Sequence, residues 1–344
     1  MKATSAISKR RAVVLALAVV AACLIAAVPA RAAVTYNATV NTMVTGVTQA
    51  QLLPSVMELS GETPALVGGV SYAIPSRASS SGTAGIDKAE QYVYEHLLSY
   101  GLTNVSYQSF PGQGGSVPAG RNVVAQITGT TNPGKIVVVS AHLDDRPWFS
   151  VSPIAYGADD DASGCSALLY IARSFAGHAF ANTIRFVFFD CEENAPWGKT
   201  TYGSGYYASQ CKAAGQNIVA EIDGDALAWN GSNNGVAYMV TRAGKKDIGN
   251  GDHAIATMWQ QAVSTYAITG MTPTVQASGD NLSDHGSFWA SGYNAVMLIE
   301  DDQSQVNPNW HTRGDRASTF NWPFYLAVVK SEVAVAAHEA GIVQ

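Results

Sequence analysis

From Asn122 onward, apolar runs of strand length alternate with segments of helical spacing. The strand-like runs are Val123–Ile127, Ile136–Val139, Ile184–Phe189, Ile218–Ile222 and Ala295–Ile299. The helical segments are Cys165–Phe175, Ser204–Lys212, Ile255–Thr265 and Phe324–Ala340. Such alternation predicts an α/β fold, because each crossover helix packs on a face of the sheet. We expect a single-domain α/β/α sandwich with a mostly parallel or mixed central sheet and helices on both faces.

No linker is long or polar enough to divide the chain after residue 32, so residues 33–344 are predicted to form one domain. A content of 47% hydrophobic residues is enough for a full core in a chain of 344 residues. The part from 33 to 117 is richer in Ser, Thr and Gly and has one clear amphipathic helix, Ala89–Tyr100, ended by Gly101. We expect this N-terminal segment to pack on the rest of the domain.

The N-terminus has the pattern of an export signal. Lys9-Arg10-Arg11 precedes the apolar stretch Ala12–Val28, and the small-residue site Ala30-Arg31-Ala32 follows. These features predict a signal peptide, residues 1–32, cleaved near Ala32, and therefore an extracellular or periplasmic protein. A membrane anchor is the alternative, but the run is short and no charged stop-transfer sequence follows. Val20–Cys23 resembles a lipoprotein box but lacks a polar tether, so no stable membrane association is expected after cleavage.

Charge and cysteine content exclude some classes of protein. A formal net charge of -6 and a pI near 5.6 argue against a nucleic-acid partner. Without the signal, Cys165, Cys191 and Cys211 remain, an odd number that permits at most one disulfide. A Cys191–Cys211 pair is conceivable, although sequence cannot decide the pairing. Cys191 is better explained as a small buried residue at a strand end than as a nucleophile beside Glu192.

Carboxylates and imidazoles are concentrated where the predicted strands end, although only 13% of residues are charged. His142 and Asp144 follow one run, Glu192 and Glu193 follow another, and Asp223 follows a third. In an open α/β sheet the functional crevice lies outside the carboxyl ends of the strands. Side chains from separate strands can therefore converge there to hold divalent metal ions.

Each of these groups also has a purely structural explanation. A lone histidine is most often a hydrogen-bonded surface residue, but Asp144 stands two residues after His142, where it could accept the second imidazole N–H. Asp159-Asp160-Asp161 could be a solvated turn or part of a calcium loop, yet it lacks the EF-hand spacing. Glu192 and Glu193 directly follow an apolar strand, where unpaired charge is destabilising and a metal would neutralise it.

Other catalytic templates fit poorly. No G-x-S-x-G elbow occurs, which argues against a serine hydrolase of the α/β type. A glycosidase would use two carboxylates but would not require His142 and His311 in addition.

The motifs resemble those of the co-catalytic di-zinc exopeptidases, in particular the secreted bacterial leucyl aminopeptidase and aminopeptidase Y type. The likeness covers about Asn122 to Asp315, with the family's elements in family order. They are Ser140-Ala141-His142-Leu143-Asp144, Gly157-Ala158-Asp159-Asp160-Asp161-Ala162-Ser163-Gly164, Glu192-Glu193, Ile222-Asp223, Ser283-Asp284-His285-Gly286-Ser287-Phe288, and His311-Thr312 followed by Asp315.

The resemblance implies two Zn²⁺ ions and a role for each matching residue. One ion would be held by His142 and Asp223, the other by Glu193 and His311, with Asp160 bridging both. The implied general base is Glu192. Asp144 would orient His142, while Asp284 and Glu300 would support the site without touching metal, and His285 matches a position that is not a ligand.

The implied function is a secreted aminopeptidase that removes the N-terminal residue of peptides or proteins through a water activated by two metals. We expect a monomer. A free α-amine could lie against the carboxylates, which favours an exopeptidase over an endopeptidase.

Two departures from the family keep alternatives open. Asp280 and Asn281 lie upstream of Ser283 with no tyrosine between to hydrogen-bond the oxyanion, so that donor is unassigned, and Trp310 precedes His311. The segment Asn194–Tyr202 is also longer than in compact members. A single-zinc glutaminyl-peptide cyclotransferase on the same fold is therefore the first alternative. A noncatalytic metal-binding module is the second, although a structural site would not require Glu192.

Overall fold

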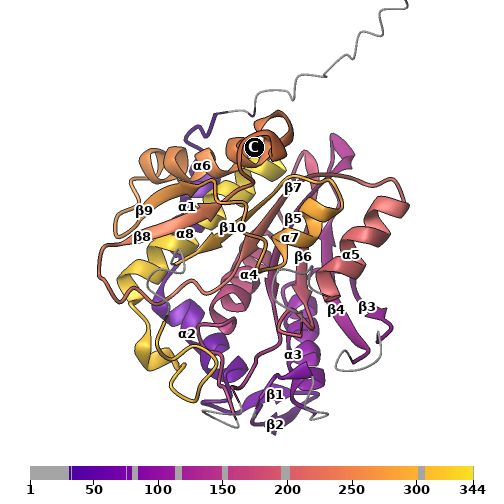
Figure 1. Ribbon diagram of the computed structural model, residues 1–344, viewed down its shortest axis with the longest axis vertical. Helices are drawn as coiled ribbons and strands as arrows, with labels where there is room; N and C mark the ends of the chain where they lie inside the picture. Colours follow the sequence, from indigo (N-terminus) through magenta and orange to yellow (C-terminus); the bar gives the residue numbers. More distant parts are fainter. Residues whose placement is uncertain are drawn as a thin grey trace, which may run out of the picture.

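A mixed eight-stranded sheet forms the centre of the molecule, in the order β3-β4-β6-β5-β7-β10-β8-β9 (Figure 1). The computed structural model describes residues 31, 33–74, 76–79, 84–112, 118–148, 154–194, 202–300 and 307–343. The strands of the sheet are β3 (Val105–Phe110), β4 (Gly120–Ile127), β5 (Asn132–His142), β6 (Asn182–Phe189), β7 (Asn217–Gly224), β8 (Val236–Val240), β9 (Thr272–Gln276) and β10 (Ala295–Ile299).

The described helices lie on both sides of this sheet. They are α1 (Ala38–Gly46), α2 (Gln49–Leu59), α3 (Gly85–Ser99), α4 (Ala162–Phe175), α5 (Tyr202–Ala213), α6 (Gly251–Thr265), α7 (His285–Ala290) and α8 (Trp322–Ala340). Strand β5 runs parallel to β6 and β7, and β7 runs parallel to β10, whereas β3, β4 and β8 add antiparallel pairs. The predicted α/β fold with a mixed sheet is confirmed.

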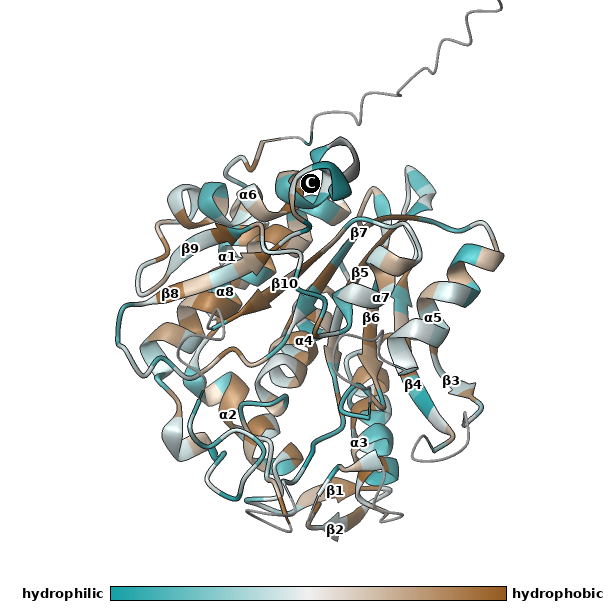
Figure 2. Cartoon of the chain, in the orientation of Figure 1, coloured by the Kyte–Doolittle hydropathy of each residue, from teal (hydrophilic) through white to brown (hydrophobic). Residues whose placement is uncertain are grey.

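Strand β5 shows how the two layers of core are built. Val137, Val139 and Ala141 point into the larger hydrophobic cluster, to which α4 and α8 contribute, while Ile136 and Val138 point into a smaller cluster with residues of α5 and α7. Successive side chains of a strand face opposite sides, so a strand covered on both faces is apolar throughout. Figure 2 shows this hydrophobic character along β5, β7 and β10.

The N-terminal segment contains more structure than the sequence predicted. Besides α3, it forms α1, which contacts α8, and α2, which contacts α4. A two-stranded hairpin, β1 (Ala65–Val67) with β2 (Val70–Tyr72), lies next to α3. Leu52 and Val56 of α2 are fully buried, so this segment completes the hydrophobic core.

The ends of the parallel strands are level with one another. Ser140 of β5 lies opposite Asp223 of β7, and His142 lies opposite Phe189 of β6. Because β5 ends at His142, β6 at Phe189 and β7 at Gly224, the three strands leave the sheet at one common edge. This edge is where the predicted ligands are found.

Three predictions concern the termini and the thiols. The predicted signal peptide lies outside the described residues, except for Arg31. Along the part of the chain that is described, we find no helix with the length and hydrophobicity needed to cross a bilayer. Cys165, Cys191 and Cys211 are all buried free thiols, so the conceivable Cys191–Cys211 disulfide is not formed.

Candidate metal centre

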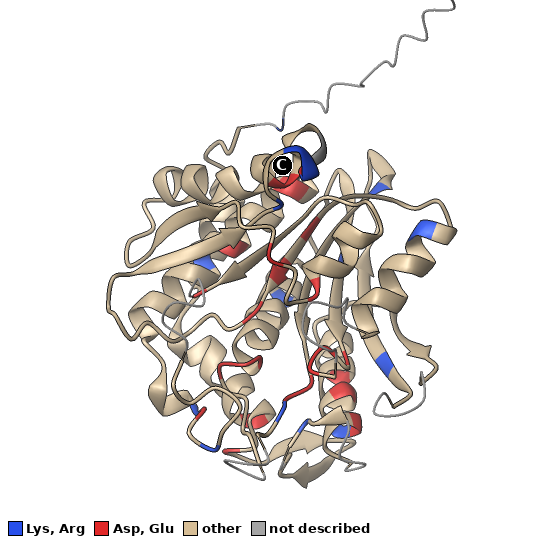
Figure 3. Cartoon of the chain, in the orientation of Figure 1, with Lys and Arg blue, Asp and Glu red and all other residues tan. Residues whose placement is uncertain are grey.

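Four segments from distant parts of the sequence bring polar side chains to the carboxyl edge of the sheet, and Asp225, directly after β7, adds a fifth. His142 ends β5, Glu192 and Glu193 follow β6, and Asp160 stands just before α4. His311 comes from a turn near the C-terminus. In Figure 3 acidic residues gather near the middle of the molecule, whereas Lys and Arg are scattered. The carboxyl edge of the sheet is therefore strongly acidic.

Asp160 lies between two histidines. Its Oδ1 atom is 3.1 Å from Nε2 of His142, and its Oδ2 atom is 3.2 Å from Nε2 of His311. Nε2 of His311 is also 2.8 Å from Oε1 of Glu193. One carboxylate thus faces two separate groups of ligand atoms, as expected of a residue that bridges two ions.

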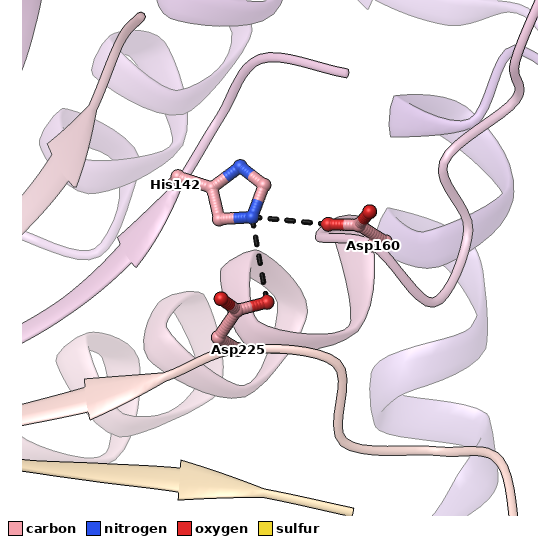
Figure 4. A group of neighbouring side chains, drawn as sticks. All are labelled: His142, Asp160 and Asp225. Carbon is pink, nitrogen blue, oxygen red and sulfur yellow. Dashed lines mark ion pairs between the residues drawn. The ribbon is translucent and has the colours of Figure 1, made fainter. Parts of the chain in front are cut away.

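Asp225, not Asp223, completes the group around His142. Its Oδ1 atom is 3.4 Å from Nε2 of His142, so the same ring nitrogen faces Asp160 and Asp225 (Figure 4). Asp223 is fully buried within β7, where its Oδ2 atom accepts the backbone N–H of His285 at 3.1 Å. The structure therefore places Asp225, rather than the predicted Asp223, beside His142, because β7 runs two residues beyond the predicted end and Asp225 comes level with His142.

Asp144 supports the centre differently from the prediction. The Nδ1 atom of His142 lies 3.1 Å from the backbone carbonyl of Asp144 and 3.7 Å from its carboxylate. The carboxylate instead accepts the backbone N–H groups of Glu192 and Glu193, at 3.0 and 3.2 Å. Asp144 therefore fixes the backbone of both glutamates, while its carbonyl orients His142.

The backbone around Asp160 is held by the side chains of neighbouring polar residues. The carboxylate of Asp315 accepts the N–H groups of Asp159 and Asp160, at 2.9 and 3.1 Å. Asp159 in turn accepts N–H of Ala228 at 2.8 Å and the side-chain amide of Asn307 at 2.8 Å. These bonds tie the loops that carry Asp160, Asp225 and His311 to one another.

The other predicted supporting residues lie around this core. Glu300 accepts the backbone N–H of Trp229 and interacts with Asp159, and it touches none of the ligand groups directly. Asp284 is fully buried near Glu192, whose pKa its charge helps to raise. His285 faces Asp223 and the carbonyl of Asp280, as expected of a residue that is not a ligand.

The backbone is strained at three points of the centre. Non-glycine residues with positive φ include Cys191 (63°), Ala226 (51°) and His311 (60°). Cys191 precedes Glu192, Ala226 follows Asp225, and His311 is itself one of the grouped side chains. Each strained residue thus belongs to the centre or is adjacent in sequence to a residue of the centre. Such conformations are uncommon in non-glycine residues and cluster at functional sites.

Burial and crowding of charge shift the pKa values of these groups. Burial disfavours the cationic form of His311, but Glu193 and Asp160 outweigh it and raise the pKa of His311 to about 10. Burial and the charge of Asp160 raise the pKa of Glu193 to about 7. Burial also raises the pKa of Glu192 well above its ordinary value. For Asp160, the two histidines outweigh burial and lower the pKa of its carboxyl group.

The donor set fits a pair of cations. Among the described residues, two groups of ligand atoms are close enough to hold a metal: His142, Asp160 and Asp225, and Asp160, Glu193 and His311. Glu193 Oε1 and His311 Nε2 are buried and lack a hydrogen-bond partner, despite lying 2.8 Å apart. Atoms bound to one zinc at 2.0–2.1 Å in a tetrahedron lie about 3.3 Å from each other. The observed separations of 2.8 to 3.4 Å bracket that value.

Two aromatic rings flank this centre at His311. The Trp310 ring lies 3.8 Å from the His311 ring, measured between centroids, and the planes are 30° apart. Trp148 donates its backbone N–H to the His311 carbonyl at 2.9 Å and exposes 44% of its surface. The approach to His311 is therefore apolar on one side and acidic on the other.

The sequence from 122 to 335 matches the model of peptidase family M28. That match covers well over half of the chain and includes every proposed ligand. The chain belongs to peptidase family M28. The family predicted from the motifs is thereby confirmed.

Curated relatives are similar at a moderate level. A probable zinc metalloprotease of Pyrenophora tritici-repentis is 24% identical over 70% of the chain and 56% of its own length. A probable leucine aminopeptidase of Arthroderma otae is 29% identical over 53% of the chain and 47% of its own length. The chain thus spans about half the length of these relatives.

Solved structures share the fold at low sequence identity. The LapA aminopeptidase of Legionella pneumophila superposes with a TM-score of 0.68 at 19% identity, covering 90% of this chain and 77% of that one. A glutaminyl cyclase of Macrostomum lignano reaches 0.68 at 18% identity, covering 90% of this chain and 95% of that one. These likenesses establish the fold alone.

Proposed function

We propose that the protein is a zinc-dependent aminopeptidase that hydrolyses the N-terminal peptide bond of peptides or proteins. The observation that carries this proposal is the placement of Asp160 between two ligand groups, with Glu192 next to the Glu193 ligand. Membership of peptidase family M28 and the names of the curated relatives support it.

His142 and Asp225 would hold one Zn²⁺, Glu193 and His311 would hold the second, and Asp160 would bind both. When bound, the ions supply Lewis acidity for the scissile carbonyl and make a water more acidic. Imidazole and carboxylate ligands suit zinc, whereas calcium and magnesium favour sites made of oxygen alone. We therefore propose two zinc ions per chain. We also propose Asp225, in place of Asp223, as the second ligand beside His142.

Glu192 is the proposed general base. Its carboxylate would take a proton from the attacking water and deliver it to the leaving amine. Asp144 accepts the Glu192 backbone N–H at 3.0 Å, which holds this residue at the edge of the site. Burial raises the pKa of Glu192 well above its ordinary value, which makes its carboxylate a stronger base toward the attacking water.

The acidic centre would also select the substrate. Glu192, Glu193, Asp160 and Asp225 attract a cationic α-ammonium group, which only the first residue of a peptide carries. Trp148 and Trp310 would contact an apolar side chain beside His311. These features favour removal of apolar N-terminal residues. Because the proposed site is built from one chain alone, we also propose a monomer.

A glutaminyl-peptide cyclotransferase remains the second candidate function. Its support is the tryptophan before the last histidine and the likeness to glutaminyl cyclases over nearly their whole length. That activity requires one zinc, however, and this chain offers two groups of ligand atoms. The Asp160-Asp161 segment also matches the peptidase pattern.

One assay separates these activities. Purified protein is incubated with Leu, Lys, Glu and Gln aminoacyl amides, with and without a chelator, and free amino acid and pyroglutamate are both measured. An aminopeptidase releases free amino acid, Leu from its amide first, and loses activity to the chelator. Pyroglutamate from the Gln substrate alone would establish the cyclase, and no turnover by the zinc-loaded protein would favour the noncatalytic module.

We also propose export of the protein after cleavage near Ala32. The basic, apolar and small-residue regions of the first 32 residues support it. Mass spectrometry of protein recovered from the medium or periplasm gives the mature N-terminus directly. Full-length protein retained in the cytoplasm would contradict export.

A further inference from the structure

Arg77 is a fully buried arginine from the N-terminal segment that no motif predicted. It is 0% exposed. Its guanidinium donates to four backbone carbonyls: Leu143 at 2.7 Å, Leu59 at 2.7 Å, Gly157 at 2.8 Å and Tyr156 at 3.0 Å. Burying a cation is destabilising unless its hydrogen bonds are satisfied, so this arrangement is highly specific for the fork of an arginine.

Asp145 completes this buried group. Its Oδ2 atom accepts the backbone N–H of Arg77 at 2.6 Å and lies 3.9 Å from the Arg77 guanidinium. Its Oδ1 atom accepts the Ser76 hydroxyl at 2.8 Å. Asp145 is 2% exposed, so the pair is shielded from solvent and from salt.

Three of the four carbonyls that Arg77 binds belong to the two segments that carry His142 and Asp160. Leu143 directly follows His142, and Tyr156 and Gly157 lead into Asp160. There is little room for movement: a Cβ atom on Gly157 would lie 2.4 Å from the Asp160 carbonyl oxygen and 2.7 Å from Nη2 of Arg77. Arg77 also anchors both segments to the end of α2 through the Leu59 carbonyl.

Arg77 makes no direct hydrogen bond to the other ligand segments in the described part of the chain, although Arg146, next to Asp145, donates to the Glu193 carbonyl at 3.0 Å. Asp315 holds the opposite side of the Asp160 loop, and Asp144 holds Glu192 and Glu193. No described contact joins Arg77 to Glu193 or His311. Asp160 belongs to both ligand groups, but His142 belongs only to the group with Asp225. Displacement of Arg77 would therefore move two ligands of the His142–Asp160–Asp225 group and one of the Asp160–Glu193–His311 group.

We propose that Arg77, with Asp145, is a positioning residue that sets the separation of His142 and Asp160 and so determines occupancy of the ion held with Asp225. This inference rests on the proposed metal centre. It assigns the N-terminal segment a part in positioning the metal ligands, whereas the family match begins only at residue 122.

The test compares Arg77→Lys with Arg242→Lys. Lysine keeps the charge but cannot bond four carbonyls in the plane of a fork. Arg242 is the matched control, because it too is buried and paired with an aspartate, Asp252, but contacts neither ligand segment. Zinc content after dialysis, zinc affinity by chelator competition and thermal unfolding are measured for both variants and for the wild type, at a temperature where all are folded.

We expect Arg77→Lys to retain one zinc where the wild type retains two, with affinity for the lost ion weakened about 10-fold or more. Arg242→Lys should keep both ions even if it unfolds at a lower temperature. Wild-type zinc affinity in Arg77→Lys, or an equal loss in Arg242→Lys, overturns the positioning role while leaving the aminopeptidase proposal intact. A wild-type protein that binds no zinc overturns both.

Asp145→Asn provides a milder second variant in case Arg77→Lys fails to fold. It retains the shape of the side chain and removes the charge that faces Arg77. Selective weakening of the same ion, in folded protein, is the expected result, and unchanged affinity for both ions contradicts the proposal.

Discussion

Two regions of the interior hold buried charge in opposite ways. Beside β8, Arg242 forms a two-pronged pair with Asp252 of α6, at 2.6 and 2.8 Å, and Asp252 also accepts N–H of Ala295 at 3.0 Å. The charges of this pair cancel. At the metal centre, carboxylates outnumber histidines, and Glu193 and His311 retain buried atoms without hydrogen-bond partners.

The difference separates a structural charge pair from a binding site. A pair that is neutral and fully bonded needs nothing further, and its removal affects folding. A buried surplus of negative charge is unfavourable in isolation and is relieved by a bound cation. The stability of the Arg242–Asp252 pair should therefore not depend on bound metal, whereas the stability of the metal centre should.

Glu192→Gln should give the largest effect and tests the functional side of this contrast. Loss of the general base is expected to lower kcat by about 1,000-fold or more, while zinc content stays at the wild-type level because Glu192 is not a proposed ligand. Steady-state hydrolysis of Leu-amide and elemental analysis measure the two quantities. The control is Glu332→Gln, which changes a buried glutamate of α8 and should keep activity. Full activity in Glu192→Gln would remove Glu192 from the mechanism.

Arg242→Ala tests the structural side. Removing one partner leaves Asp252 buried and unpaired, which is expected to lower the free energy of unfolding by about 3 kcal/mol or more. Denaturant unfolding measures the loss. Zinc affinity of the folded fraction should be unchanged, and a loss of zinc without a loss of stability would reverse the assignment of the two regions.

Glu332 presents a third case, a buried carboxylate without a countercharge. It is 1% exposed, and burial, with a smaller contribution from Asp223, raises its pKa from 4.5 to about 8. The folded state therefore holds a proton that the unfolded state releases above pH 4.5, so the stability that this proton supplies is lost as pH rises toward 8.

Glu332→Gln should remove that pH dependence. At about 1.4 kcal/mol per pKa unit, the wild type is expected to lose about 2 kcal/mol relative to this variant between pH 6 and pH 8. Unfolding curves at both pH values measure the difference. Parallel curves for the two proteins would show that Glu332 has an ordinary pKa.

Ala226→Gly should give the smallest effect. Glycine relieves the strain at φ 51° but loses more conformational freedom on folding, which leaves a net gain of about 0.5 kcal/mol. The matched control is Ala267→Gly, because Ala267, just after α6, has a similar φ of 50°. Equal shifts in melting temperature with unchanged zinc affinity are expected, and weaker zinc binding only in Ala226→Gly would mean that the strain positions Asp225.

Long apolar patterns predicted most of the fold. The five predicted strands all occur, and Ala295–Ile299 matches β10 at both ends. Strands β3 and β9 were missed because they lie at the sheet edges and are mostly only partly buried, so their apolar pattern is weak. Strand β8 was missed as well; it has only five residues. Helices α1 and α2 were missed because their short sequences are rich in Thr, Gln and Ser.

Motifs in the sequence pointed to four of the five described residues whose ligand atoms lie close together. His142, Asp160, Glu193 and His311 stand in recognisable motifs and are brought together by the structure. Asp223 and Asp225 are two residues apart in the sequence Ile-Asp-Gly-Asp, and only the register with β5 distinguishes them. Arg77 could not be found, because a single arginine in a Ser-rich segment carries no pattern until its carbonyl partners are known.

Zinc content of Asp225→Asn and Asp223→Asn, measured by elemental analysis after dialysis, tests the central assignment most directly. The two changes are chemically identical and lie two residues apart. Two zinc ions per chain in the wild type and in Asp223→Asn, and one in Asp225→Asn, is the predicted result. Loss of an ion from Asp223→Asn while Asp225→Asn keeps both would contradict the assignment.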